Sequence, residues 1–285
     1  MRWGLLVTLC ACDSIFGLQP TKQGGLDAKF FDAPADAPFT CPPLGTTPFF
    51  QTQPQQAVFD SCVAFQTTAD GSLALAACTG QLAMGPVSGP LAPVADLAMY
   101  GTFVHQNASL SPEGDQVLVS EPVSGTQINW IRYLAAGGGH WTRGDTLVWP
   151  SPITSSVYGV SQPTLGPTRH MMALDNGGYL DEVIDDGTPN LQLARRYGQG
   201  DLGVYNYRGP SLAPDGLRLV IYATRPDGQG HVLQSLWYSD RPSIDVDFRA
   251  FEPILAVVVT DPFLRVDCGR LYFSGIGSIW YVQPQ

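Results

Sequence analysis

The chain has 285 residues, of which 44% are hydrophobic and only 14% are charged, and this composition excludes an intrinsically disordered protein. Its formal net charge of −10 excludes nucleic acid as a partner, because the phosphate backbone would be repelled. The 31 glycines, 24 prolines and 11% aromatic residues are typical of many short strands joined by tight turns, so we expect an all-β fold.

The first twelve residues have the pattern of an export signal. Arg2 precedes the short apolar stretch 3–9, as in a secretory leader. The next residues, Leu9-Cys10-Ala11-Cys12, resemble a bacterial lipobox, which implies that Cys12 is lipidated and becomes the new N-terminus. The alternatives are an ordinary start of a cytosolic protein and a buried strand. No later stretch reaches about 18 apolar residues, so we expect membrane contact only through this lipid.

The next segment, residues 13–47, is rich in proline, alanine and aspartate. Such a composition favours an extended tether rather than a packed domain. From residue 48 to residue 285 the sequence changes to β-branched and aromatic runs separated by turns. We therefore expect a signal peptide over residues 1–12, a tether over 13–47 and one folded domain over 48–285.

Four cysteines remain after processing at Cys12, namely Cys41, Cys62, Cys78 and Cys268. An even number of cysteines in an exported protein indicates disulfides, and four cysteines allow three pairings. Cys62 and Cys78 flank a predicted hairpin and lie nearly opposite each other across it. That pairing is preferred, and it leaves Cys41 to pair with Cys268. Metal binding is the weaker interpretation, because no Cys-x-x-Cys pattern or paired histidine accompanies these residues.

The domain contains an internal repeat. Residues 107–120 and 209–222 share a small-Leu-small-Pro-acid-Gly pattern followed by an alternating strand; residues 261–273 give a third copy, and 162–174 and 65–75 give two weaker ones. Proline fixes φ and glycine accepts a positive φ, so the pattern predicts a tight turn between two strands. The predicted turn residues are Asp70, Gly71, Pro112, Glu113, Gly114, Pro214, Asp215, Gly216, Asp267 and Gly269.

These repeats resemble the TolB-like propeller repeat, in which Ser-Pro-Asp-Gly is followed by an apolar strand and then an aromatic-rich one. Aromatic-rich runs follow the three clearer copies at 129–133, 235–238 and 278–281. The resemblance covers residues 57–285. It implies a single β-propeller of about five four-stranded blades, with six as the alternative. We expect residues around Phe49 and Phe50 to supply the outer strand of the last blade and close the ring.

The sequence contains no recognisable catalytic or cofactor motif. Residues 198–203 match Gly-x-Gly-x-x-Gly, but a strand and a proline follow where a nucleotide site needs a helix, so a loop is predicted. The four histidines are scattered without ligand spacing, and each is interpreted as a surface or packing residue. The acidic residues 175–186 are interpreted as solvated turns rather than a calcium loop. We therefore expect no metal and no cofactor.

Most of the tryptophans lie in predicted strands and are expected in the core. The exception is the glycine-rich stretch at His140 and Trp141, which is the one candidate for a binding loop.

TolB-like propellers commonly act as interaction platforms through the central funnel and its loops, and the resemblance implies the same role here. The sequence thus predicts a monomeric, non-enzymatic, lipid-anchored protein-interaction or ligand-binding module of the bacterial cell envelope, on the periplasmic or outer surface. Its partner would be an envelope protein or a glycan. The alternative is a carbohydrate-active enzyme or a sugar-binding lectin of propeller form.

Overall fold

The computed structural model describes residues 54–78, 80–97, 108–124, 127–153, 157–229, 231–255, 259–265, 269–275 and 278–282. These residues form β-strands joined by turns and loops, without a helix, so the predicted all-β fold is confirmed. All of them lie in one structural unit, Pro38–Gln285. The predicted signal peptide and nearly all of the predicted tether and its boundary lie outside the described residues.

The strands form five four-stranded antiparallel sheets, and each sheet is one blade of a propeller. The innermost strands of blades 1 to 5 are β2 (Cys62–Thr67), β6 (Ala108–Leu110), β10 (Val157–Val160), β14 (Tyr205–Leu212) and β18 (Thr260–Leu264). The second strands are β3 (Ala74–Cys78), β7 (Gln116–Ser124), β11 (Arg169–Asp175), β15 (Arg218–Pro226) and β19 (Leu271–Gly275).

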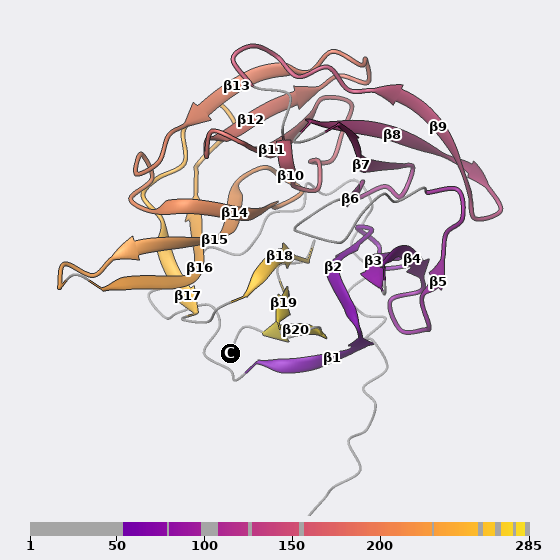
Figure 1. Cartoon of the computed structure of the whole chain (residues 1–285), viewed down its shortest axis with the longest axis horizontal. Coiled ribbons are helices and arrows are strands. Elements are labelled where there is room, and N and C mark those ends of the chain that lie inside the picture. Colours follow the sequence, from indigo (N-terminus) through magenta and orange to yellow (C-terminus); the bar gives the residue numbers. More distant parts are fainter. Residues whose placement is uncertain are drawn as a thin grey trace, which may run out of the picture. The chain divides into compact units, whose positions relative to one another are not determined.

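The third strands are β4 (Gln81–Gly85), β8 (Gln127–Gly137), β12 (Leu180–Asp185), β16 (Val232–Asp240) and β20 (Ser278–Val282). The outer strands are β5 (Ala92–Pro93), β9 (His140–Thr146), β13 (Gln192–Tyr197), β17 (Glu252–Leu255) and β1 (Gln55–Asp60). Each inner strand contacts the inner strand of the next blade, from β2 through β6, β10, β14 and β18 back to β2, and this closes the ring (Figure 1). Five blades, rather than the alternative of six, are therefore confirmed.

The ring closes because the N-terminal strand β1 completes the last blade. β1 pairs with β20 in antiparallel register, Gln55 opposite Tyr281, and the Tyr281 hydroxyl donates to Gln55 Oε1 at 2.7 Å. Closure by an N-terminal strand was expected from the sequence. The described closing strand starts at Gln55, whereas Phe49 and Phe50, to which the prediction assigned this role, lie outside the described residues.

The repeat turn joins the first and second strands of each blade. In blades 1, 2 and 4 the turn glycines Gly71, Gly114 and Gly216 have φ values of 67°, 72° and 73°, as the acid-Gly pair of the repeat predicts. The turns also link neighbouring blades, because Ala69 donates its amide hydrogen to the carbonyl of Pro112 at 2.7 Å. In the same way Leu165 donates to the carbonyl of Pro214 at 2.9 Å.

The weak repeat copy in blade 3 lies where it was predicted, but its alignment was two residues out of register. The turn is closed by the bond from the Thr164 amide to the His170 carbonyl, which corresponds to the bond from Ser111 to Gln116 in blade 2. Thr164 thus takes the place of Ser111, a place that the sequence alignment assigned to Gly166. The blade 3 turn is one residue longer than the others and does not end on an acid-Gly pair, so its sequence does not fix the register.

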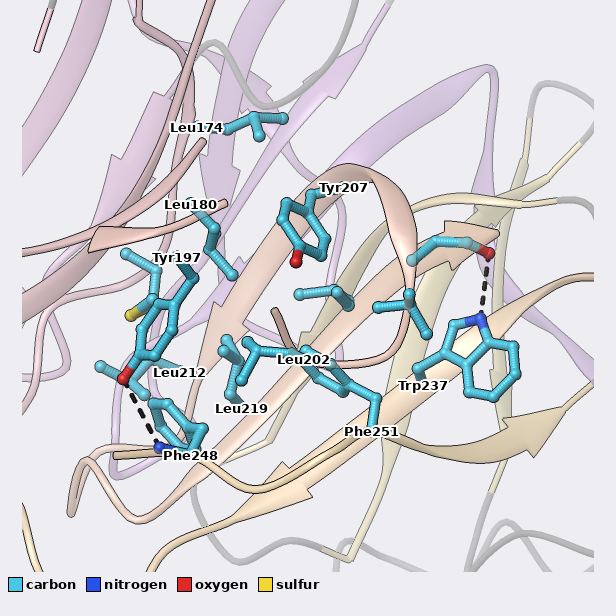
Figure 2. Packing of buried hydrophobic residues seen from close by; sticks show 14 residues of the cluster. Leu174, Leu180, Tyr197, Leu202, Tyr207, Leu212, Leu219, Trp237, Phe248 and Phe251 are labelled. Atoms are coloured by element: carbon cyan, nitrogen blue, oxygen red, sulfur yellow. Dashed lines mark hydrogen bonds between the residues drawn. The ribbon is translucent and has the colours of Figure 1, made fainter. Parts of the chain in front are cut away.

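Each blade buries its faces against its neighbours, and blades 3 and 4 show how. Leu180 and Tyr197 from blade 3 pack with Leu219, Trp237 and other residues of blade 4 in one cluster (Figure 2). The buried Trp237 indole donates from Nε1 to the Ala223 carbonyl at 2.9 Å, which satisfies its polar atom. A single blade could not cover its own apolar faces, so the propeller is stable only as a closed ring.

Replacing Gly114 by alanine is expected to lower the free energy of unfolding by roughly 1–2 kcal/mol, because alanine is strained at a positive φ and has no room there. A Cβ at Gly114 would lie 2.9 Å from Thr68 Cγ2 of the neighbouring blade. Gly228 is the matched control: its φ is 79°, but a Cβ there would meet nothing within 4 Å. Urea unfolding midpoints should shift more for Gly114→Ala than for Gly228→Ala; equal shifts would show that the contact between the blades does not matter.

Candidate functional site

The centre of the propeller is crossed by polar side chains. Gln66 of β2 donates to the Ala108 carbonyl and accepts from the Leu110 amide, which ties blade 1 to blade 2. Gln162 of blade 3 reaches across to blade 1 and donates from Nε2 to the Thr67 carbonyl at 2.8 Å. Since blades 1 and 3 are not neighbours in the ring, this bond spans the central channel. The resemblance implied a binding site in a central funnel, and at this level the Gln162 side chain lies across the channel.

The five inner strands carry a single carboxylate, Asp261 of β18. Burial raises the pKa of Asp261 to about 6, and the Thr260 hydroxyl, which donates to its Oδ2 at 2.9 Å, partly opposes this shift. Glycoside hydrolysis requires two carboxylates that face each other across the bond to be cleaved. The inner strands therefore do not supply that arrangement.

The acidic residues of blade 3 are buried, so their interpretation as solvated turns is wrong for all but Asp186. The side chains of Asp175, Asp181, Glu182 and Asp185 are at most 2% exposed, and each faces an arginine. Burial raises the pKa of Asp181 to about 7, while the neighbouring arginine opposes the shift. The adjacent Asp181 and Glu182 lie on opposite faces of β12, and both are buried because neighbouring blades cover both faces of blade 3. The local sequence does not show which carboxylates have arginine partners.

Two of these ion pairs occupy the same place between neighbouring blades, a contact that we call a seam. At the seam between blades 2 and 3, Arg132 Nη2 lies 2.7 Å from Asp185 Oδ1. At the seam between blades 3 and 4, Arg241 Nη2 lies 2.7 Å from Glu182 Oε1. All four side chains are almost completely buried. Each pair places buried charge at its seam, and the terminal guanidinium nitrogens of both arginines donate hydrogen bonds within the protein.

The corresponding place at the seam between blades 1 and 2 holds no ion pair. Arg132 and Glu182 occupy equivalent positions on the third strands of blades 2 and 3. Each pairs with the residue of the second strand that lies two places after the carbonyl closing the turn, and in blade 1 Met84 has this position. Their ion-pair partners, Asp185 and Arg241, each lie three residues after the same position in the next blade. The equivalent residue of blade 2 is Ala135, which lies three residues after Arg132. Methionine and alanine thus replace two oppositely charged residues.

A cleft of about 660 Å³ lies at this seam, and we call it the open seam. Met84 and Ala135 both line it. Its apolar walls also include Leu73, Pro93, Val94 and Trp141, and its polar lining includes Ser72, Asp96 and His140. The cleft exists because Met84 and Ala135 leave space where two other seams are filled by an arginine and a carboxylate.

The wall contributed by blade 2 is shaped by a tight hairpin. Gly137 pairs with His140, and the two residues between them, Gly138 and Gly139, have φ values of 64° and 82°. A two-residue loop with two positive φ values matches the right-handed twist of the flanking strands. The hairpin therefore places His140 and Trp141 at the first two positions of β9, beside blade 1.

Asp96 of blade 1 anchors this hairpin. Its Oδ2 accepts from the Trp141 amide and from His140 Nδ1, both at 3.1 Å. The Trp141 amide and the His140 ring hold the pKa of Asp96 below its ordinary value. Asp96 is therefore an anion at neutral pH in a cleft whose walls are mainly apolar.

The structure brings the two candidate binding residues, His140 and Trp141, to the lining of one cleft. Trp141 does not lie in a flexible loop, as the sequence suggested, but in strand β9, where it is only 9% exposed and packs in the core between blades 1 and 2. The His140 side chain is 77% exposed. The glycine motif at 198–203 forms the loop between β13 and β14, as predicted.

Cys62 and Cys78 form the predicted disulfide and lie directly opposite each other in the β2–β3 hairpin. The other cysteine predictions, Cys12, Cys41 and Cys268, fall outside the described residues, as does the turn residue Asp267. In the part of the chain that is described, no three His, Cys, Asp or Glu side chains are grouped to hold a metal ion. No described segment is a helix long and apolar enough to cross a membrane.

No protein-family model matches the chain, and no curated protein matches it. Many solved structures do. The putative TolB from Agrobacterium tumefaciens is 17% identical with a TM-score of 0.47, and the match covers 75% of this chain and 69% of that one. TolB from Acinetobacter baumannii is 13% identical, TM-score 0.46, covering 79% and 55%. A putative glycosidase from Bacteroides thetaiotaomicron is 8% identical, TM-score 0.50, covering 79% and 87%. At such identities the likeness concerns the propeller fold alone.

Proposed function

We propose that this protein is an exported, lipid-anchored propeller that serves as a non-catalytic binding module of the bacterial cell envelope, and that it binds a protein partner at the open seam. The observation that carries the proposal is the contrast between seams. Blades 2, 3 and 4 are joined by buried ion pairs, whereas blades 1 and 2 leave a cleft of about 660 Å³. A cleft of that size falls within the range of ligand sites.

The chemistry of the open seam favours a protein partner over a glycan. Asp96 is the only carboxylate among the described residues that line the cleft, and a glycosidase needs a second one. Trp141 is too buried to offer its ring as a stacking surface for a sugar. The apolar wall around Met84 suits the side chains of a peptide or protein better than it suits a polar sugar.

Export is supported by two features of the chain. The first is the leader and lipobox pattern that ends at Cys12. The second is the disulfide between Cys62 and Cys78, because disulfides persist in oxidising compartments such as the periplasm and the cell surface. The proposed lipid on Cys12 would hold the propeller at a membrane.

Photo-crosslinking in the native envelope tests the proposal. A photoreactive residue at Ser72, which is exposed and lines the cleft, should yield a defined protein adduct, whereas the same residue at the exposed Gln229 should not. Ala135→Leu should abolish the Ser72 adduct because leucine fills the cleft. The matched control is Ala136→Leu, since Ala136 is exposed but does not line the cleft. An adduct at Ser72 that survives Ala135→Leu would contradict binding at the open seam.

A further inference from the structure

The molecule itself shows what a seam of this propeller accommodates. At both filled seams the occupant is an arginine side chain whose guanidinium meets a carboxylate and one or two backbone carbonyls. Arg132 pairs with Asp185 and donates to the Gly187 carbonyl at 2.8 Å. Arg241 pairs with Glu182 and donates to the Gly216 carbonyl at 2.7 Å. At the open seam the equivalent positions are occupied by Met84 and Ala135, so neither blade places an arginine there.

The open seam offers a different carboxylate to such an arginine, because Ala135 occupies the place of Asp185 and Asp96 comes from the segment after β5. The bonds from His140 and Trp141 both end on Asp96 Oδ2, and within the described residues no donor contacts Oδ1. Gly137 lines the cleft and lies two residues after Ala135, the same offset as that of Gly187 from Asp185. Gly187 is the residue whose carbonyl accepts from Arg132. The cleft is therefore lined by a carboxylate and by the residue that corresponds to Gly187.

Resting on the function proposed above, we infer that the open seam binds an arginine side chain of the partner protein, with its guanidinium at Asp96 and its methylene stem between the Met84 and Ala135 walls. An apolar channel that ends in an anion suits a side chain with an aliphatic stem and a charged tip. The planar fork of arginine donates to a carboxylate and a carbonyl at once, which lysine does with less geometric definition. The net charge of −10 also favours a basic partner.

Three short peptides test this inference on the full chain: acetyl-Ala-Ala-Arg-Ala-Ala-amide, and the same peptide with citrulline or lysine in place of arginine. Citrulline has nearly the shape of arginine but no charge. The readout is the NMR shift of the Trp141 indole and the Gly139 amide during titration. The arginine peptide should bind roughly two- to fivefold more tightly than the citrulline peptide, the ratio expected of an exposed ion pair.

Asp96→Asn should remove that preference while keeping an oxygen for the Trp141 amide, and Ala135→Leu, but not Ala136→Leu, should abolish binding of all three peptides. Equal binding of arginine and citrulline peptides, or a preference that survives Asp96→Asn, would overturn the inference. Equal binding of the lysine peptide would replace it by a site for any cation. If these tests fail but the Ser72 adduct still depends on Ala135, the partner inserts another group and the proposed function stands.

Discussion

Glu182→Leu is expected to lower the free energy of unfolding by about 3–5 kcal/mol, because it leaves a buried arginine without its counter-ion. The side chains of Arg241 and Glu182 are both 0% exposed, and among the described residues Glu182 is the only carboxylate that contacts Arg241. Arg241→Met should cost less, since Glu182 keeps His170 and Arg195 as partners. Urea unfolding at pH 7 measures both changes.

The double variant Glu182→Leu/Arg241→Met is the control for this prediction. Apolar residues of similar volume often replace a buried ion pair at little cost, so the double variant should recover most of the stability lost by Glu182→Leu. Such recovery would show that the loss comes from an unpaired charge rather than from poor packing of leucine. If the two single changes simply add, the pair is not coupled and the prediction is wrong.

The same pair makes stability depend on pH in the acid range. Burial opposes ionisation of Glu182, but hydrogen bonds from His170, Arg241 and Arg195 outweigh it and lower the pKa from 4.5 to about 2. A folded-state pKa below the unfolded value stabilises the folded protein above pH 4.5, by about 3 kcal/mol. This contribution is lost as the pH falls from 4.5 through 2. The stability difference between the wild type and Glu182→Leu should therefore shrink over that interval.

The sequence predicted correctly those elements whose conformation depends on a few consecutive residues. Gly114 and Gly216 adopt a positive φ. The run of proline, acidic residue and glycine indicates such a turn without any information on tertiary contacts. The Asp70-Gly71 turn in turn fixes the register of the first hairpin, so the Cys62–Cys78 disulfide followed from counting residues on both sides of it.

The seams were not predictable in this way. Glu182 and Arg241 are 59 residues apart in sequence, and their contact depends on the rotation of one blade relative to the next. The open seam is harder still, because Met84 and Ala135 are unremarkable apolar residues. Their significance appears only when they are compared with Arg132 and Asp185 at the equivalent positions of the next seam. That comparison requires the strand register of the blades concerned. The sequence left this register undetermined in blade 3, where the turn is longer.

Replacing both Cys62 and Cys78 by alanine is expected to lower the free energy of unfolding by about 3 kcal/mol, the loop-entropy contribution of a disulfide that closes a loop of this size. The two cysteines are 16 residues apart. For a domain of this length, about 3 kcal/mol corresponds to a fall in melting temperature of roughly 6–12 °C. The wild type in a reducing agent should melt near the temperature of the double variant, and the reducing agent should leave the variant unchanged. A double variant that melts like the oxidised wild type would show that β-sheet pairing alone holds the first hairpin.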